Sequence, residues 1–252
     1  LPDGRRLPHC IDFEANIYLR QENTGMLLGT YEPRSTPWSL DGTPQNFGHD
    51  LLEPNLERIA DRLELAFERI PALSTAGIKD TINGPFVFSP DGNPMIGPVP
   101  GVKNYWCCCG TQIGIGWGPG LTRELARWMV HGSSDISMRE YDPRRFGDYA
   151  KKDWQVIKAH EDYKLRHEIP FPHFNRLAGR PIKPSPLHET LLKKGAVYEE
   201  VYGFERPRWF ARNDVAQKDH YSFHRNVVHD MVGIEVKAVR EKVGIMDVTA
   251  LC

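Results

Sequence analysis

The chain has 252 residues, enough for one large domain or two ordinary ones. Its 32 lysines and arginines almost balance its 33 aspartates and glutamates, so the net charge is −1. This balance argues against a nucleic-acid or membrane-surface binder, because such proteins carry an excess of positive charge. No apolar run is long enough to cross a membrane as a helix, so the sequence predicts no membrane partner.

The first residues contain no methionine and no apolar stretch typical of a secretory signal, and the last residues are apolar. We therefore expect a segment of a longer protein. The five cysteines include three adjacent ones, Cys107–Cys109, a spacing unlike a disulfide framework or a zinc site. We expect them to be small apolar residues of a buried strand in a protein from a reducing compartment.

The N-terminal part predicts a β-hairpin, a loop and a helix. Strand-forming residues at 16–20 and 26–31 flank the turn-forming residues 22–25. A loop rich in proline and glycine is expected over 32–50. Residues 54–70 repeat apolar side chains at helical spacing and therefore predict an amphipathic helix.

A strand, a glycine-rich loop and a helix are predicted over 104–109, 110–120 and 121–131. This order invites comparison with the dinucleotide-binding fingerprint G-x-G-x-x-G. The fingerprint fails, because the third glycine position falls on Pro119 or Leu121, depending on the starting glycine.

The glycines of this loop still have a physical meaning. Gly114, Gly116, Gly118 and Gly120 carry no side chain, so a ligand can approach the backbone closely. A helix beginning at about Pro119 would also present unpaired N–H groups and a positive dipole end to acceptor oxygens. A tight connection without a ligand explains the same glycines. Residues 89–94 likewise predict either a surface turn or a rigid loop beside a cofactor.

The C-terminal half predicts a helix over 144–167 and then a proline-rich connection. A short helix is expected after Ser185, which is a suitable N-cap before a proline. A strand over 196–204 and a helix over 233–243 complete the prediction. The ten histidines show no metal-binding spacing.

Tyr18 and Arg20 are two residues apart in a predicted strand and therefore share one face of it. A phenol and a guanidinium on one face are suited to holding a small carboxylate.

Several segments, taken in order, carry a family resemblance. They are residues 17–22 (IYLRQE), 25–32 (GMLLGTYE), 83–98 (NGPFVFSPDGNPMIGP), 101–106 (GVKNYW), 141–149 (YDPRRFGDY) and 178–186 (AGRPIKPSP). Their order resembles the flavin-dependent oxidoreductases of the dimethylglycine and sarcosine dehydrogenase type. Residues 239–248 (VREKVGIMDV) are similar to the entry of the folate-binding domain of glycine-cleavage aminomethyltransferases.

The resemblance implies a mixed α+β or α/β fold in three parts. Residues 1–136 would be the C-terminal part of a FAD-dependent amine oxidoreductase domain of the D-amino-acid-oxidase-like (DAO-like) type. Residues 137–186 would form a small central linking domain, and residues 187–252 the beginning of an aminomethyltransferase-like, folate-binding domain. A Rossmann-type half with a true G-x-G-x-x-G would lie outside this sequence.

The resemblance also implies roles for particular residues. The flavin would be approached by the glycine loop and the helix that follows it, namely by Gly110, Gly114, Gly116, Gly118, Gly120 and Leu121. Pro94 and Met95 would lie close to this loop and would also bind the cofactor. Tyr18 would be the catalytic tyrosine that faces the flavin ring, and Tyr18 with Arg20 would hold the substrate. Trp117 and Pro119 depart from the family's more uniform small-residue loop.

The implied reaction is oxidation of an N-methyl amine, such as dimethylglycine or sarcosine, by FAD. The substrate nitrogen must be unprotonated for hydride to leave its methyl carbon, and the one-carbon product would pass to tetrahydrofolate. The electron acceptor stays open, and bacterial cytoplasm or the mitochondrial matrix is the expected location. Two alternatives remain. One is a non-catalytic relative like the pyruvate dehydrogenase phosphatase regulatory subunit, and the other is an aminomethyltransferase-type protein with a vestigial oxidoreductase half.

Overall fold

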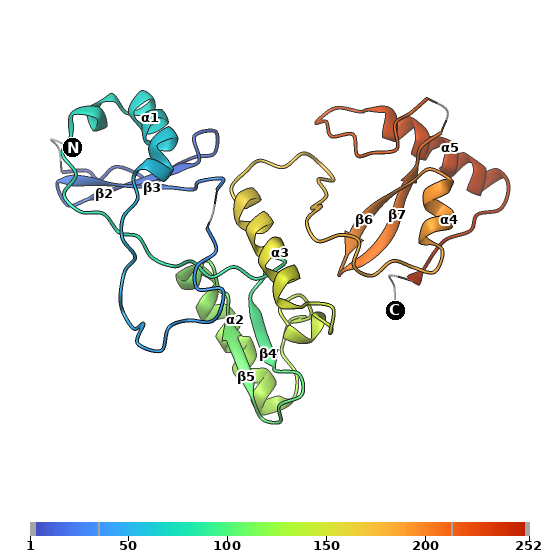
Figure 1. Cartoon of the computed structure of the whole chain (residues 1–252), viewed down its shortest axis with the longest axis horizontal. Coiled ribbons are helices and arrows are strands. Elements are labelled where there is room, and N and C mark those ends of the chain that lie inside the picture. The colour runs from blue at the N-terminus through green and yellow to red at the C-terminus, as the bar shows by residue number, and fades with distance from the viewer. Residues whose placement is uncertain (1–3, 35, 213, 250–252) are drawn as a thin grey trace. The chain divides into compact units, whose positions relative to one another are not determined.

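The structure, a computed structural model, describes residues 4–34, 36–212 and 214–249 (Figure 1). It divides into two compact units. Unit 1 holds the described residues up to Asp142 together with Lys158–Ile169, and unit 2 holds Pro143–Ile157 and the described residues from Pro170 onward. Both units contain strands and helices, which confirms the predicted mixed α/β fold.

Seven strands and five α-helices make up the regular structure of the described residues. The strands are β1 (Cys10–Asp12), β2 (Ile17–Glu22), β3 (Gly25–Thr30), β4 (Met95–Pro98), β5 (Trp106–Cys109), β6 (Ala196–Val201) and β7 (Phe204–Phe210). The α-helices are α1 (Ala60–Arg69), α2 (Gly114–His131), α3 (Lys152–Leu165), α4 (His188–Lys193) and α5 (Val227–Glu241).

In unit 1, strands β1, β2 and β3 form an antiparallel sheet. The β2–β3 turn is as tight as predicted, and Asn23 adopts the left-handed conformation that such two-residue turns require. Ile17 and Leu19 are buried on one face, where they pack with Ala66 of α1. Because side chains alternate along a strand, Tyr18 and Arg20 lie on the other face.

The helix predicted over 54–70 is shorter than expected. A single 3-10 turn, Glu57–Ile59, precedes α1. Ala66 of α1 is fully buried, whereas the apolar Phe67 is exposed. Leu65 and Ile70 complete the packing against the sheet.

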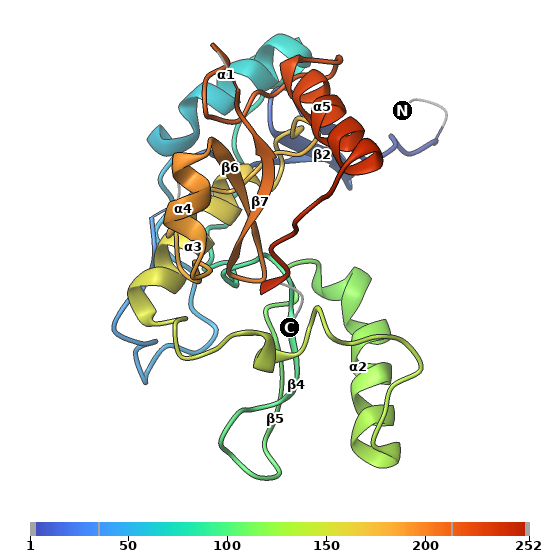
Figure 2. The same cartoon turned by 90° about the vertical axis from the view of Figure 1, so that its right-hand side faces the viewer.

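Strands β4 and β5 form a second antiparallel pair, with α2 beside it (Figure 2). Ile96 of β4 packs with Leu121 and Leu125 of α2. The prediction that the second helix begins near Pro119 is wrong, because α2 begins at Gly114 and contains the proline. The partly buried Trp117 packs against this same core, and this contact favours a helix that includes the glycine run.

The predicted strand at the cysteine run exists as β5, but it is not buried. Cys108 and Cys109 are exposed, and Cys107 is half-buried. β5 pairs only with β4 in the part of the chain that the structure describes, so part of this two-stranded sheet remains accessible.

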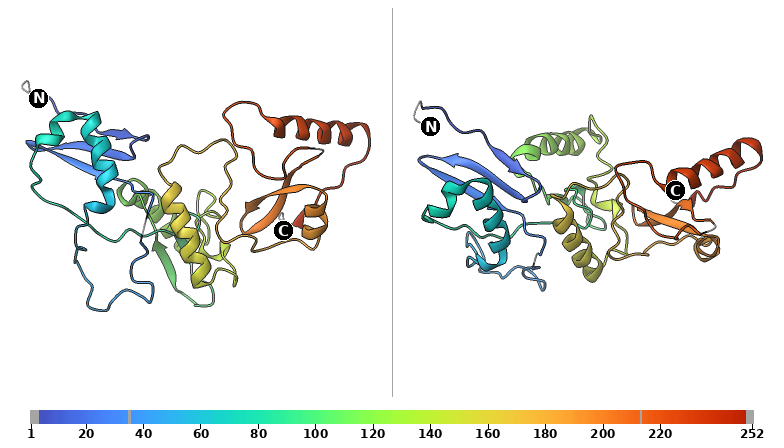
Figure 3. Two further views of the ribbon diagram at one scale, coloured as in Figure 1. Left: turned by 45° about the horizontal axis from the view of Figure 1, so that its top comes forward. Right: turned by 90° about the horizontal axis from the view of Figure 1, so that it is seen from above.

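Unit 2 is built on the β6–β7 hairpin, with α5 packed against it (Figure 3). Trp209 of β7 is fully buried together with Val197 of β6 and Met231 of α5. The sequence did not predict β7, because Pro207 and its charged neighbours hide the strand pattern. Among residues 4–34, 36–212 and 214–249, no helix is both long enough and apolar enough to cross a membrane.

Candidate functional site

Tyr18 lies on the face of the sheet opposite α1 and is half-buried. Its partner in the β2–β3 register is Gly29, and its ring covers this glycine. A methyl group at Gly29 would stand 1.9 Å from Cζ of Tyr18, so the ring position requires glycine there. Tyr31 supports the ring from the side, with centroids 5.2 Å apart.

Arg20 is exposed on this same face and forms an ion pair with Glu22 at 3.0 Å. Both side chains are about half exposed, and such surface pairs contribute only about 0–1 kcal/mol. The guanidinium can therefore exchange Glu22 for another carboxylate at little cost.

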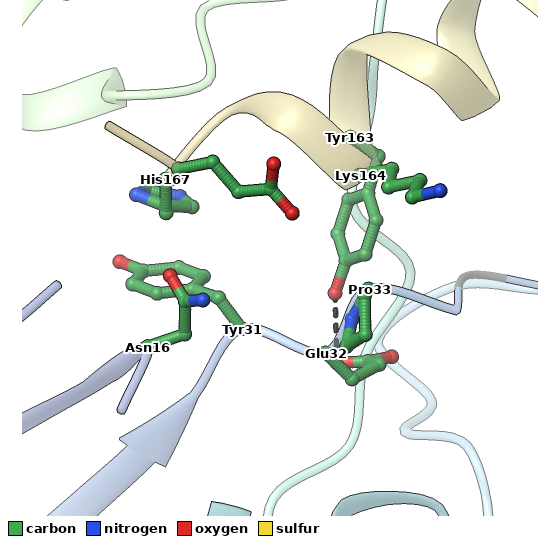
Figure 4. Close-up of a pocket in the computed structure, with 8 residues that line it drawn as sticks. Asn16, Tyr31, Glu32, Pro33, Tyr163, Lys164 and His167 are labelled. Atoms are coloured by element: carbon green, nitrogen blue, oxygen red, sulfur yellow. Dashed lines mark hydrogen bonds between the residues drawn. The ribbon is translucent and has the colours of Figure 1, made fainter. Parts of the chain in front are cut away.

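A small pocket opens beside the end of β3 (Figure 4). Asn16, Tyr31 and Glu32 line it from the sheet side. On the other side, Tyr163 lines it from α3, and His167 lines it from the segment just after this helix. The Tyr163 hydroxyl donates a hydrogen bond of 2.8 Å to Oε2 of Glu32. Burial and this carboxylate raise the pKa of Tyr163, so the phenol stays protonated and keeps donating.

His167 stacks on Tyr31 with ring centroids 3.4 Å apart and planes inclined by 16° (Figure 4). Burial lowers the pKa of His167, and the neighbouring Arg166 lowers it further. Burial raises the pKa of Tyr31, because it favours the neutral phenol. Both rings are therefore neutral near pH 7 and pack as an uncharged pair.

The predicted flavin-side residues Pro94, Met95 and Gly110 lie together. Gly110 has a φ of +70°, and a methyl group on it would contact Pro94 Cα at 3.8 Å and Met95 N at 3.9 Å. Pro94 is fully buried. The structure therefore brings the 89–94 turn against the start of the glycine-rich segment.

Asp162 of α3 fixes this junction. It is fully buried, and a methyl group on Gly92 would lie 2.6 Å from its carboxylate oxygens. Nε2 of Gln112 donates to Asp162 Oδ2 at 3.5 Å, and Arg166 donates to the Gly92 carbonyl at 3.4 Å. The turn and the residues before α2 are thus held by the same helix that reaches the Tyr31 pocket.

The beginning of α2 has features that suit a ligand with both acceptors and donors. Ile113, the N-cap residue, makes no side-chain capping bond, and the first helical N–H to pair is that of Trp117. The preceding N–H groups can therefore donate outward. Gly114 and Gly118 face open space. Gln112 contributes a buried Oε1 without a hydrogen-bond partner in the described structure, so an acceptor is available as well.

These donors, the acceptor and the bare backbone fit the edge of a flavin ring, which carries carbonyl oxygens and an N–H. Gly114, Gly116, Gly118 and Gly120 all lie inside α2 rather than in a loop, which corrects the local geometry expected for them. Leu121 is buried in the core with Ile96 and Leu125. Its predicted flavin contact stays an expectation.

Sequence reasoning missed Tyr31, His167 and Asp162. Tyr31 directly follows β3, the strand that pairs with the strand of Tyr18, so the predicted hairpin was a usable signal for it. The partners on α3 are more than 100 residues away in the chain, and no spacing rule joins them to the sheet. In the described ranges, no group of histidine, cysteine, aspartate or glutamate side chains is arranged to hold a metal ion.

Comparison with known families divides the chain in three. Residues 1–128 match the FAD dependent oxidoreductase family, and residues 131–185 match the FAD dependent oxidoreductase central domain. Residues 187–252 match the GCVT N-terminal domain.

Three curated relatives illustrate the range of similarity. Mitochondrial dimethylglycine dehydrogenase of Mus musculus is 38% identical over 97% of this chain and 29% of its own length. Mitochondrial sarcosine dehydrogenase of Mus musculus is 34% identical, over 89% of this chain and 25% of its own. The mitochondrial pyruvate dehydrogenase phosphatase regulatory subunit of Mus musculus is 29% identical, over 96% and 28%. The chain therefore spans less than a third of the length of these relatives.

Proposed function

This chain belongs to the FAD-dependent oxidoreductases of the dimethylglycine and sarcosine dehydrogenase family, and we propose that the protein oxidises an N-methyl amine, either dimethylglycine or sarcosine. The observation that carries the proposal is the Tyr18 face. An otherwise ordinary hairpin there uses a glycine, Gly29, to seat a tyrosine ring on the side away from its helix.

Bound flavin would supply the oxidising chemistry by accepting hydride from the N-methyl carbon. Tyr18 is then proposed to orient the substrate amine, and Arg20 to bind the substrate carboxylate after releasing Glu22. Placement is the main contribution that these side chains can make, because hydride transfer depends steeply on the distance and alignment of the reacting atoms.

On the cofactor side, Gly110 and the first turn of α2, with Gly114, Gly116 and Gly118, are proposed to contact the flavin through bare backbone. Pro94 and Met95 are proposed to bind the flavin beside Gly110, which is supported by their position within 4 Å of a methyl group built on Gly110. Gly120 is proposed to contact the flavin as part of the same glycine-rich surface of α2.

We also keep the three-part division at 1–136, 137–186 and 187–252 as a proposal, with the last part beginning a folate-binding domain. Transfer of the one-carbon unit to tetrahydrofolate would follow from it. The mitochondrial matrix or bacterial cytoplasm is the proposed location, and the named relatives are mitochondrial.

The direct test is anaerobic reduction of the flavin-loaded protein. Dimethylglycine or sarcosine should bleach the yellow flavin absorption, whereas glycine, which has no N-methyl group, should leave it unchanged. A flavin-loaded protein that neither methylated amine reduces would contradict the proposal.

A glycine-to-alanine pair tests the cofactor contact. At Gly118 an added methyl meets only open space, and alanine favours a helix over glycine by about 0.8–1.0 kcal/mol. Gly118→Ala should therefore preserve folding but weaken flavin binding if the ligand occupies that space. Gly233→Ala in α5 is the matched control, since it also lies in a helix and faces open space. Equal flavin affinity in the two variants would mean that the glycine-rich start of α2 does not contact the flavin.

A non-catalytic regulatory role is the second candidate. It is favoured by the similarity to the phosphatase regulatory subunit and by the bulky Trp117 and rigid Pro119 within the glycine run. This candidate predicts a protein that purifies without flavin and is unaffected by N-methyl amines.

A further inference from the structure

The resemblance implied a separate central linking domain over residues 137–186, yet part of this region packs into unit 1. The residues from Lys158 to Ile169, the C-terminal part of α3 and its continuation, belong to the compact unit that contains Tyr18. Their side chains face two directions. Asp162 and Arg166 hold the turn at Gly92, and Tyr163 and His167 reach the end of β3.

The contact with the sheet is made of aromatic rings in series. His167 stacks on Tyr31 at 3.4 Å, and Tyr31 leans on Tyr18 at 5.2 Å with an inclination of 41°. The far side of Tyr18 is closed by Gly29. The ring of Tyr18 thus contacts the backbone at Gly29 and the ring of Tyr31. His167 is the outer ring of the Tyr31–His167 stack.

Neighbouring contacts hold the Tyr31–His167 stack in place. Residue Glu32, next to Tyr31, accepts hydrogen bonds from Tyr163 at 2.8 Å and from Arg58 at 3.1 Å. Phe88 packs edge-on against Tyr163 with centroids 5.0 Å apart. Because Asp162 is fully buried at the preceding position of the helix, α3 has little freedom to shift relative to the sheet.

We infer that His167 is a positioning residue, which acts through Tyr31 to fix the ring of Tyr18 for the amine oxidation. This inference rests on the proposed function for its kinetic consequence. Its structural content, that removal of the His167 ring loosens Tyr18, does not depend on the substrate. The role assigned to His167 is packing rather than proton transfer, because its ring lies face to face with Tyr31 instead of pointing a nitrogen at it.

The kinetic test uses the flavin-loaded protein with dimethylglycine and sarcosine. His167→Ala should lower kcat/KM by about 10- to 100-fold, as expected when a reacting group loses its alignment. His167→Phe keeps a flat ring and should retain most of the activity. His131→Ala, at the exposed end of α2, is the matched control and should have no effect.

A double-mutant cycle separates positioning from general damage. In the Tyr18→Phe background, His167→Ala should cost much less than in the wild type, because both changes act through one hydroxyl-bearing ring. An equal cost in the two backgrounds, or no recovery in His167→Phe, would overturn the inference.

A second measurement needs no turnover. Tetranitromethane nitrates accessible tyrosines, and the modified peptides can be quantified by mass spectrometry. Nitration of Tyr18 should be faster in His167→Ala than in the wild type or His167→Phe, with the exposed Tyr105 as internal reference. An unchanged Tyr18 rate would refute the inference. A faster rate in a protein that no N-methyl amine reduces would support the positioning while rejecting the proposed function.

Discussion

The hairpins β2–β3 and β6–β7 share one topology but use their polar side chains differently. In β6–β7, Glu205 is buried and forms a bidentate ion pair with Arg180. Lys183 lies over the rings of Tyr149 and Phe204. Polar groups of this hairpin are thus committed to partners within unit 2.

In β2–β3, the face away from α1 carries a half-buried tyrosine and an arginine in an exposed pair. Its stabilising contacts are ring packing rather than buried charge. The difference fits a stabilising role for β6–β7 and the ligand-binding role that we propose for the Tyr18 face. Substitutions in and around the two hairpins test whether they differ in this way.

The largest effect is expected from Arg180→Ala. The change leaves Glu205 buried without its partner, which costs about 3–5 kcal/mol of folding free energy. Denaturant unfolding would measure the loss. Arg206→Ala, which breaks a more exposed pair with Glu199, should cost only about 0–1 kcal/mol. Similar costs for both would mean that the buried pair of β6–β7 is not its principal polar support.

Gly29→Ala tests the β2–β3 hairpin. The new methyl would displace the Tyr18 ring, so we expect kcat/KM for the N-methyl amine to fall by about 100-fold while the fold survives. Gly25→Ala is the control, because its nearest contact is an ordinary 3.6 Å. Full activity in Gly29→Ala would show that the seat of Tyr18 is unimportant.

The β2–β3 hairpin and the shared face of Tyr18 and Arg20 followed from local pattern, because strand alternation and turn chemistry are encoded within a few residues. The start of α2 could not be predicted from local pattern, since the packing of Trp117 overrode the helix-breaking tendency of Pro119. Nor could the Tyr31–His167 stack, which depends on tertiary contact between distant segments. The burial expected for Cys108 failed for a similar reason, because a strand's environment depends on its neighbours.

Gly92→Ala should reveal how tightly Asp162 holds the flavin-side turn. Gly92 and Gly101 both have a φ of +76°, so alanine at either position costs about 1–2 kcal/mol in backbone strain. Only Gly92 faces the buried Asp162 carboxylate, which should add about 1–3 kcal/mol. Unfolding free energies of the two variants measure this excess, and equal values would contradict the proposed hold.

The smallest effect concerns pH. Burial lowers the pKa of His167 below its usual 6.5, so the unfolded chain binds this proton more readily than the folded one. Stability from the neutral ring is therefore complete above pH 6.5 and declines as the pH falls below it. His167→Phe should lose less stability than wild type between about pH 8 and pH 5 in denaturant unfolding. Parallel curves would mean that His167 is not buried against Tyr31.

The proposed function depends most on Tyr18 facing the reacting amine, and the rate of flavin reduction by dimethylglycine in rapid mixing tests this directly. Tyr18→Phe should slow the reduction by at least about 100-fold, whereas Tyr105→Phe, which changes an exposed phenol, should match the wild type. A Tyr18→Phe protein that reduces its flavin at the wild-type rate would contradict the assignment of this face to the oxidative site.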